Sequence, residues 1–137
     1  MVPIPNQTTV SGKPLNELIK KEKLDLIIER TRKGGAEVMK LLEKGSAFYA
    51  PASAGIEMAE SYIKDLKKTL PCATYLNGEY GVKNLYAGVP VIIGSDGVEK
   101  VVALTLNKDE KENFDLSIKA VKNLITKAKE IDPQLNN

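Results

Sequence analysis

LYAGVPVIIGSDGVEKVVALTL, residues 85–106, places two apolar runs on either side of a short polar turn. Side chains two positions apart share one face of a β-strand. The first run therefore predicts a strand with one apolar face, made by Leu85, Ala87, Val89, Val91 and Ile93. Pro90 has no backbone N–H to donate, which predicts an edge position or a bulge there. Asp96-Gly97 is typical of a tight turn, so the two runs predict a β-hairpin rather than a phosphate-binding loop.

A shorter strand is expected before this hairpin. CATYL, residues 72–76, predicts the strand, and NGEYG predicts the turn that follows, with Glu79 and Tyr80 as turn residues rather than site residues. Cys72 is expected to be buried and inert. Upstream, residues 53–68 predict a helix that Pro71 helps to end. Its expected buried stripe is Ala54, Met58, Ala59, Tyr62, Ile63 and Leu66.

Helical spacing dominates the two ends of the chain. Residues 13–44 carry apolar side chains three, four and seven apart, namely Leu24, Ile27, Ile28, Thr31, Val38, Met39 and Leu42. Gly34-Gly35 interrupts that pattern, either as a kink between two shorter helices or as a close approach by another helix or subunit. Near the C-terminus, Asn107 and Glu110 form a variant capping box for a helix to about Ile131, before Pro133. Its stripe is Phe114, Ile118, Val121, Ile125 and Ala128.

This order of elements predicts an α+β fold with long helices packed on a small antiparallel sheet. The 137 residues suit one domain, 1–137. No βαβ alternation and no G-x-G-x-x-G motif after a strand is present, so a dinucleotide-binding Rossmann domain is not expected in this chain. No apolar run approaches the roughly 20 residues of a membrane span, which predicts a soluble protein.

Composition narrows the chemistry further. The chain has no histidine, which excludes a Ser-His-Asp triad, a Cys-His pair and a His-based zinc site within it. The net charge of +2, with Arg30 and Arg32 as the only arginines, does not suggest a nucleic-acid surface. The single cysteine excludes an internal disulfide and fits a cytoplasmic location. No catalytic residue and no metal ligand set is therefore predicted here.

Three long stretches resemble one family. They are MVPIPNQTTVSGKPL, then ERTRKGGAEVMKLLEKGSAFYAPASAGIEMAESYIKD, then LPCATYLNGEYGVKNLYAGVPVIIGSDGVEKVVAL. Together they resemble the C-terminal domain of malate dehydrogenases of the lactate-dehydrogenase-like branch common in bacteria. The resemblance spans essentially the whole chain, with a shortening around Lys20 to Leu24. It implies that the chain starts just after the catalytic histidine, which explains why Val2 and Ile4 alternate with prolines at the very beginning.

The resemblance also implies an activity for the complete enzyme. Members oxidise malate to oxaloacetate while NAD accepts a hydride and a His–Asp pair takes the hydroxyl proton. The expected partners are malate or oxaloacetate, the nucleotide-binding domain of the same enzyme and further copies in a homo-oligomer, with no nucleic acid and no membrane. The catalytic histidine and the substrate-binding arginines would lie upstream, so this chain alone is expected to bind no NAD and to be inactive.

Two site residues follow from the resemblance within GSAFYAPAS. Ala47 resembles the position that faces the bound substrate, and Pro51 the position that packs near the nicotinamide ring. Small residues ahead of a helix also serve close packing alone, and that alternative stays open. Three further alternatives are a portion of a lactate dehydrogenase, a non-catalytic oligomerisation module, and one half of a split enzyme.

Overall fold

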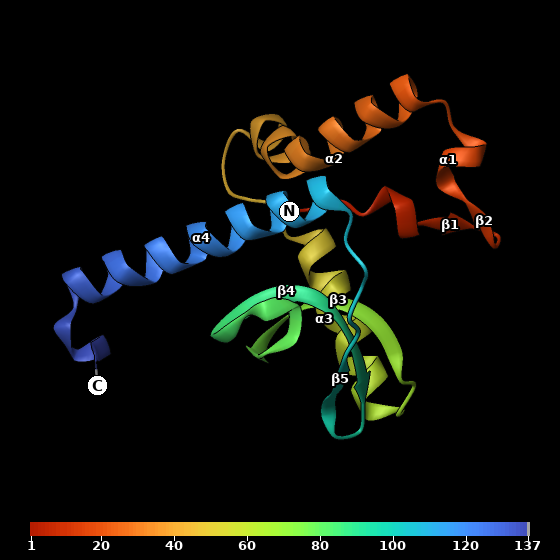
Figure 1. Cartoon of the computed structure of the whole chain (residues 1–137). Helices are drawn as coiled ribbons and strands as arrows, with labels where there is room; N and C mark the ends of the chain where they lie inside the picture. The colour runs from red at the N-terminus through yellow and green to blue at the C-terminus, as the bar shows by residue number, and fades with distance from the viewer. Residues whose placement is uncertain (137) are drawn as a thin grey trace. The chain divides into compact units, whose positions relative to one another are not determined.

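The computed structural model describes residues 1–136 and divides into two compact units (Figure 1). The first unit combines Met1–Glu37 with the chain from Leu106 onward, and the second is Val38–Thr105. The elements of the first unit are η1 (Pro5–Gln7), β1 (Thr9–Val10), β2 (Lys13–Pro14), α1 (Leu15–Leu18), most of α2 (Lys21–Leu42), α4 (Lys108–Ile131) and η3 (Pro133–Asn136). The second unit holds α3 (Tyr49–Ile63), β3 (Lys68–Asn77), η2 (Glu79–Gly81), β4 (Lys83–Gly94) and β5 (Gly97–Val101).

An antiparallel sheet with the order β3-β4-β5 forms the core of the second unit. The predicted hairpin is confirmed, because Gly94 pairs with Gly97 across a turn at residues 95–96. The predicted strand at residues 72–76 is confirmed as part of β3, and Leu76 pairs there with Leu85. The alternation along β4 is also confirmed, since the five residues of the expected apolar face are all buried: Leu85, Ala87, Val89, Val91 and Ile93. The α+β fold class predicted from the sequence is therefore correct.

Pro90 lies neither on an edge strand nor at a bulge, the two predicted alternatives, because β4 is the central strand and its register shift against β5 falls between Ile92 and Ile93. The Pro90 carbonyl accepts a hydrogen bond from the Val102 N–H at 2.8 Å. Any residue other than proline at this position would also donate its own N–H to the Val102 carbonyl, as paired residues of antiparallel strands do. The Tyr80 hydroxyl replaces that missing donor, lying 2.7 Å from the Val102 carbonyl oxygen. The same hydroxyl oxygen accepts from the Leu104 N–H at 3.0 Å. A turn residue thus satisfies the backbone beside a central-strand proline.

Removing the Tyr80 hydroxyl should destabilise the second unit. Tyr80→Phe keeps the ring but leaves a half-buried carbonyl and N–H without this partner, which is expected to lower the free energy of unfolding by about 1–3 kcal/mol. Urea unfolding followed by circular dichroism measures it. Tyr75→Phe is the matched control, since the Tyr75 hydroxyl bonds only at the surface, to Asn84, and its loss should change stability by less than about 0.5 kcal/mol. Equal effects of both variants would contradict the role of Tyr80.

Helix α3 differs from its prediction in both extent and burial. It spans Tyr49–Ile63 instead of residues 53–68, and Pro71 lies inside β3, paired with Pro90, so it does not end the helix. The predicted buried stripe is wrong: Ala54, Met58, Ala59, Tyr62, Ile63 and Leu66 are all exposed. The helix is instead anchored by Ser61, which is fully buried and donates a hydrogen bond to the Ile93 carbonyl at 2.7 Å. Helical spacing alone could not show which of several apolar faces meets the sheet.

In the first unit the expected helix at residues 13–44 begins later. The short hairpin β1-β2 and the single turn α1 precede it, and α2 then runs without interruption through Gly34-Gly35. No other described segment comes within 4 Å of a Cβ added at either glycine, so a close approach by another helix of this chain is not seen there. Of the predicted stripe, only Leu24 is buried. The Arg30–Glu37 ion pair, 2.9 Å between Nη2 and Oε1, lies on the solvent side of α2.

Helix α4 begins as predicted. Asn107 accepts a hydrogen bond from the Glu110 N–H, and the Glu110 carboxylate accepts one from the Asn107 N–H, each at 2.9 Å. Phe114 and Ile118 of the predicted stripe are buried, whereas the stripe is progressively exposed toward Ile125. Within the described residues, no helix is long and apolar enough to cross a membrane.

Candidate functional site

The two site residues expected from the sequence lie at one junction of the second unit. Ala47 is half-buried in the segment that leads into α3, and Pro51 is the third residue of that helix. Proline is tolerated there because the first N–H groups of a helix have no partner within it. The first α-helical bond runs from the Ala52 N–H to the Phe48 carbonyl at 2.9 Å. The junction therefore holds the two residues four positions apart on a defined helix start.

Aromatic rings flank this junction. Phe48 and Tyr49 have ring centroids 4.8 Å apart at a tilt of 48°, and both rings are exposed. Neither Ala47 nor Pro51 carries a titratable group, so these two residues can shape an apolar wall but cannot transfer a proton. Their contribution is confined to packing against a bound molecule.

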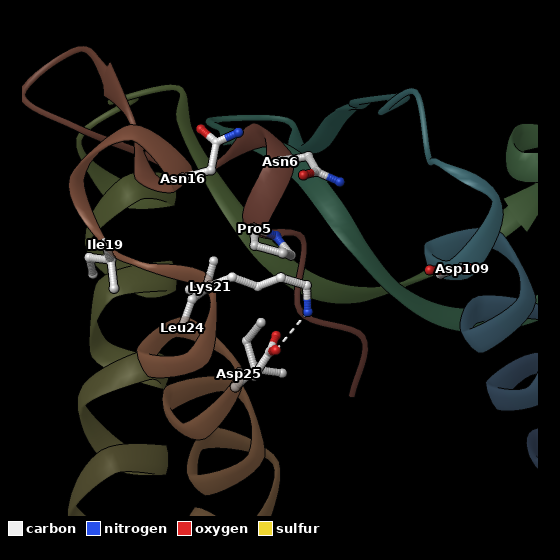
Figure 2. Close-up of a pocket in the computed structure, with 9 residues that line it drawn as sticks. Pro5, Asn6, Asn16, Ile19, Lys21, Leu24, Asp25 and Asp109 are labelled. Carbon is white, nitrogen blue, oxygen red and sulfur yellow. Dashed lines mark hydrogen bonds and ion pairs between the residues drawn. The ribbon is translucent and has the colours of Figure 1, made fainter.

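A second candidate is a pocket of about 380 Å³ in the first unit (Figure 2). Three parts of the sequence form it: the N-terminal segment through Asn6 and Asn16, the first turns of α2, and the start of α4 at Asp109. Apolar side chains complete its wall: Pro5, Ile19, Leu24 and Ile28. Nothing in the sequence indicated this pocket, because its lining is drawn from residues more than 100 positions apart.

The pocket's charged groups are partly paired. Lys21 Nζ lies 2.7 Å from Asp25 Oδ2, as the dashed line in Figure 2 shows, and this hydrogen bond raises the pKa of the lysine above its ordinary value. The lysine therefore stays protonated at neutral pH and cannot act as a nucleophile. Two amides and the Asp109 carboxylate complete the polar lining. The pocket can hydrogen-bond a small polar molecule, but it contains no thiol or hydroxyl nucleophile.

The N-terminal segment is tied to the start of α4 beside this pocket. Asn6 Nδ2 donates to Glu110 Oε1 at 3.3 Å, and the Glu110 side chain is buried. The same carboxylate closes the capping box of α4, so one side chain serves both elements. The expected packing of the N-terminal segment is observed in part, because Val2 and Ile4 are half-buried.

The remaining reactive groups are poorly suited to chemistry. Cys72 is buried in β3 as predicted, and burial raises the pKa of its thiol, which disfavours the reactive thiolate. Among residues 1–136, no group of three or more histidine, cysteine, aspartate or glutamate side chains could hold a metal ion. The Glu79 carboxylate accepts from the Asn77 N–H at 2.7 Å, and such backbone bonds lower its pKa, which suits a turn residue.

Comparison with known proteins supplies the family. Residues 1–132 match the family described as the lactate/malate dehydrogenase, alpha/beta C-terminal domain. A malate dehydrogenase of Pelagibacter ubique is 60% identical over 99% of this chain, and one of Roseobacter denitrificans is 54% identical over 99%. The chain spans 44% of the length of each. The alignment with the Pelagibacter ubique enzyme has 141 positions, whereas this chain has 137 residues, so at least four positions of the relative have no counterpart here. The predicted place of this shortening, Lys20 to Leu24, stays a prediction.

Solved structures agree with this match. The malate dehydrogenase of Salinibacter ruber superposes with a TM-score of 0.92 at 41% identity, covering 97% of this chain and 43% of that one. The lactate dehydrogenase of Eimeria maxima, solved with NADH and oxamate, superposes with a TM-score of 0.91 at 40% identity, covering 96% of this chain and 42% of that one. Sequence and fold point to the same conclusion: the chain belongs to the lactate/malate dehydrogenase family, as its alpha/beta C-terminal domain.

Proposed function

We propose that this chain is the substrate-side domain of an NAD-dependent malate dehydrogenase, which converts malate and NAD to oxaloacetate and NADH. The observation that carries the proposal is the 60% identity to a malate dehydrogenase over 99% of the chain. Identity of this level along a whole domain supports a shared substrate. The unbridged, buried Cys72 supports a cytoplasmic location.

Within this function the chain shapes the site and leaves the chemistry to other residues. Ala47 borders the substrate, where a small side chain leaves room for the second carboxylate of a four-carbon diacid. Pro51 packs near the nicotinamide ring of NAD. The chain spans 44% of the relative's length, and the residues that hold NAD and the proton-accepting His–Asp pair would lie in the remainder. NAD therefore binds the complete enzyme, and this chain alone contributes only an apolar wall.

Oligomers are part of the proposal. Large apolar side chains are exposed on α2, α3 and α4, among them Leu41, Ile56 and Leu124. A homo-oligomer of the complete enzyme, together with its nucleotide-binding domain, would cover these surfaces. A module that only mediates assembly explains the exposed surfaces equally well, but it does not explain the match to a dehydrogenase over the whole chain.

The second candidate function is that of a lactate dehydrogenase domain. It is favoured by the close superposition on the Eimeria maxima enzyme, whose TM-score is nearly that of the malate dehydrogenase from Salinibacter ruber. The fold alone cannot separate the two substrates, which differ by one carboxylate. Sequence identity favours malate, because three relatives at 54% to 60% identity are malate dehydrogenases.

A chimeric enzyme tests the proposal. The C-terminal domain of the Pelagibacter ubique malate dehydrogenase would be replaced by this chain, and kcat/KM measured for oxaloacetate and for pyruvate. We expect the chimera to reduce oxaloacetate with at least about 100-fold preference, since the substrate-binding arginines of the parent half would pair the second carboxylate and Ala47 of this chain leaves room for it. The parent enzyme is the control. A folded chimera that reduces pyruvate better would favour the lactate dehydrogenase, and one that reduces neither would contradict a substrate-side role.

A further inference from the structure

The NGEYG turn contains the one asparagine of this chain that a glycine follows. Asn77 is the last residue of β3 and Gly78 begins the turn into η2, and both residues are exposed. Every other asparagine precedes a larger residue or ends the chain, among them Asn16, Asn84 and Asn123. Glycine has no Cβ, so its backbone nitrogen is open to the side chain of the preceding residue. Sequence and exposure together make Asn77 the asparagine best placed for attack by the backbone.

The reaction at such a pair is an intramolecular exchange of amide bonds. The Gly78 nitrogen gives up its proton and bonds to Cγ of Asn77, while the Cγ–Nδ2 bond breaks and the amide nitrogen takes up a proton and leaves as ammonia. Water then opens the resulting cyclic imide at one of its two carbonyl carbons. Opening at Cγ gives aspartate, and opening at the backbone carbonyl carbon gives isoaspartate, in which the chain continues through Cγ. Water is the only co-reactant, and nothing is oxidised or reduced.

The backbone around Asn77 departs from a regular strand. The pairing of β3 with β4 shifts its register between Leu76 and Asn77, and Gly78 has a φ of 134°. Two residues further on, Tyr80 lies in the left-handed region at a φ of 55°. An irregular strand end opens more easily than the interior of a sheet, because fewer bonds must break together. The turn can therefore supply the movement that attack requires.

Hydrogen bonds in the turn control when the attack can occur. The Gly78 N–H donates to the Val82 carbonyl at 2.8 Å, and a nitrogen held in this bond is protected from reaction. Tyr80 resists opening of the turn, because its hydroxyl bonds to the Val102 carbonyl at 2.7 Å and accepts from the Leu104 N–H at 3.0 Å. The rate of reaction is then the open fraction of the turn multiplied by the rate in the open chain.

We propose that Asn77 is a site of spontaneous modification, converted to aspartate and isoaspartate at a rate set by opening of the turn that follows β3. The proposal goes beyond the dehydrogenase function and does not depend on it. It uses only residues of the second unit and needs neither a substrate nor a partner.

The two products should affect the fold differently. Lys83 is the partner of Asn77 across the strands, so a carboxylate at position 77 gains an opposite charge there, which the nearby Glu79 carboxylate partly offsets. Isoaspartate instead adds one backbone atom before Gly78, which the present pairing cannot accommodate without displacing the turn. That displacement would move Tyr80, so we expect the isoaspartate form to be the less stable of the two.

Peptide mapping after storage tests the site. The folded chain is kept in mildly alkaline buffer for several days, then denatured and cut with trypsin, which releases residues 69–83 as a peptide with Asn77 as its only asparagine and no aspartate. We expect this peptide to gain the mass difference between an acid and an amide, and to separate into two products by chromatography. The peptide that begins at Asn84 should keep its mass. Asn77→Gln is the matched control, because its longer side chain would have to close a larger and less favourable ring.

Two tyrosine variants test the control by the turn. Tyr80→Phe removes both bonds of the hydroxyl and should speed the modification by about tenfold, the change in open fraction that corresponds to such a loss. Tyr75→Phe should leave the rate unchanged, because the Tyr75 hydroxyl bonds only to Asn84 at the surface. Unfolding in urea should bring the unchanged chain and both variants to one common, faster rate.

The proposal would be overturned by a folded chain in which the peptide of residues 69–83 changes no faster than in Asn77→Gln, because the turn would then protect Asn77 completely. Equal rates in folded Tyr80→Phe and Tyr75→Phe would refute the control by the turn. None of these measurements involves turnover, so their failure leaves the chimera test of the proposed function unaffected.

Discussion

The 137-residue chain by itself is expected to show no oxaloacetate-dependent oxidation of NADH. The chain has no histidine, and the hydrogen bond to Asp25 raises the pKa of Lys21 in the polar pocket, so neither can take up the substrate proton at neutral pH. Loss of acid–base catalysis alone slows an enzyme by about 10²–10⁴-fold. Loss of the groups that hold NAD beside the substrate removes the larger advantage of proximity, so turnover should fall below detection.

This result is measured by following NADH absorbance with purified chain and oxaloacetate. The chain must be produced in a host that lacks malate dehydrogenase, with a mock purification as control, because traces of a host enzyme would imitate activity. Adding the separately produced nucleotide-binding half of the Pelagibacter ubique relative tests the split-enzyme alternative, which predicts restored turnover. Turnover by the chain alone that exceeds the mock sample would refute our interpretation of the absent histidine.

The largest effect on stability is expected from Leu76→Ala. Leu76 is fully buried in β3 and pairs with Leu85 of β4, so its truncation leaves a cavity in the only sheet of the second unit. Such substitutions cost about 2–5 kcal/mol, a large share of the stability of a small domain. Urea unfolding measures the change.

Leu124→Ala is the matched control for this prediction, because Leu124 is 66% exposed and truncating it should shift stability by less than about 0.5 kcal/mol. A loss below about 1 kcal/mol in Leu76→Ala would show that the sheet relaxes around the missing side chain. The core assigned to the second unit would then be wrong.

Local patterns predicted the sheet and the last helix well. Alternation along β4 identified its buried face correctly. Side chains of a strand point alternately to its two faces, so once one residue is known to be buried, the facing of all the others follows. Asn107 and Glu110 located the start of α4, because a capping box is a contact between residues three apart and needs no tertiary context. The resemblance to malate dehydrogenases identified the family, which composition and spacing alone would not have done.

The failures share one cause. Pro90 was expected at an edge or a bulge, but it lies in the central strand, where the Tyr80 hydroxyl replaces the N–H that the proline lacks; that hydroxyl comes from a turn ten residues earlier in the sequence. The stripe expected to be buried on α3 is exposed, because a helix that is apolar on several sides does not reveal which side meets the sheet. The pocket lined by Asn6 and Asp109 was not predicted at all.

The amino-acid sequence was sufficient for what depends on neighbours along the chain: the strands, the hairpin turn, the capped helix and the family to which they belong. Tertiary structure decided the rest, namely that Ser61 ties α3 to the sheet, that Tyr80 supports a proline in the central strand, and that Glu110 joins the N-terminal segment to α4. The physical reason is that secondary structure depends on the spacing of side chains over a few residues, whereas burial and long-range hydrogen bonds depend on which distant segments meet.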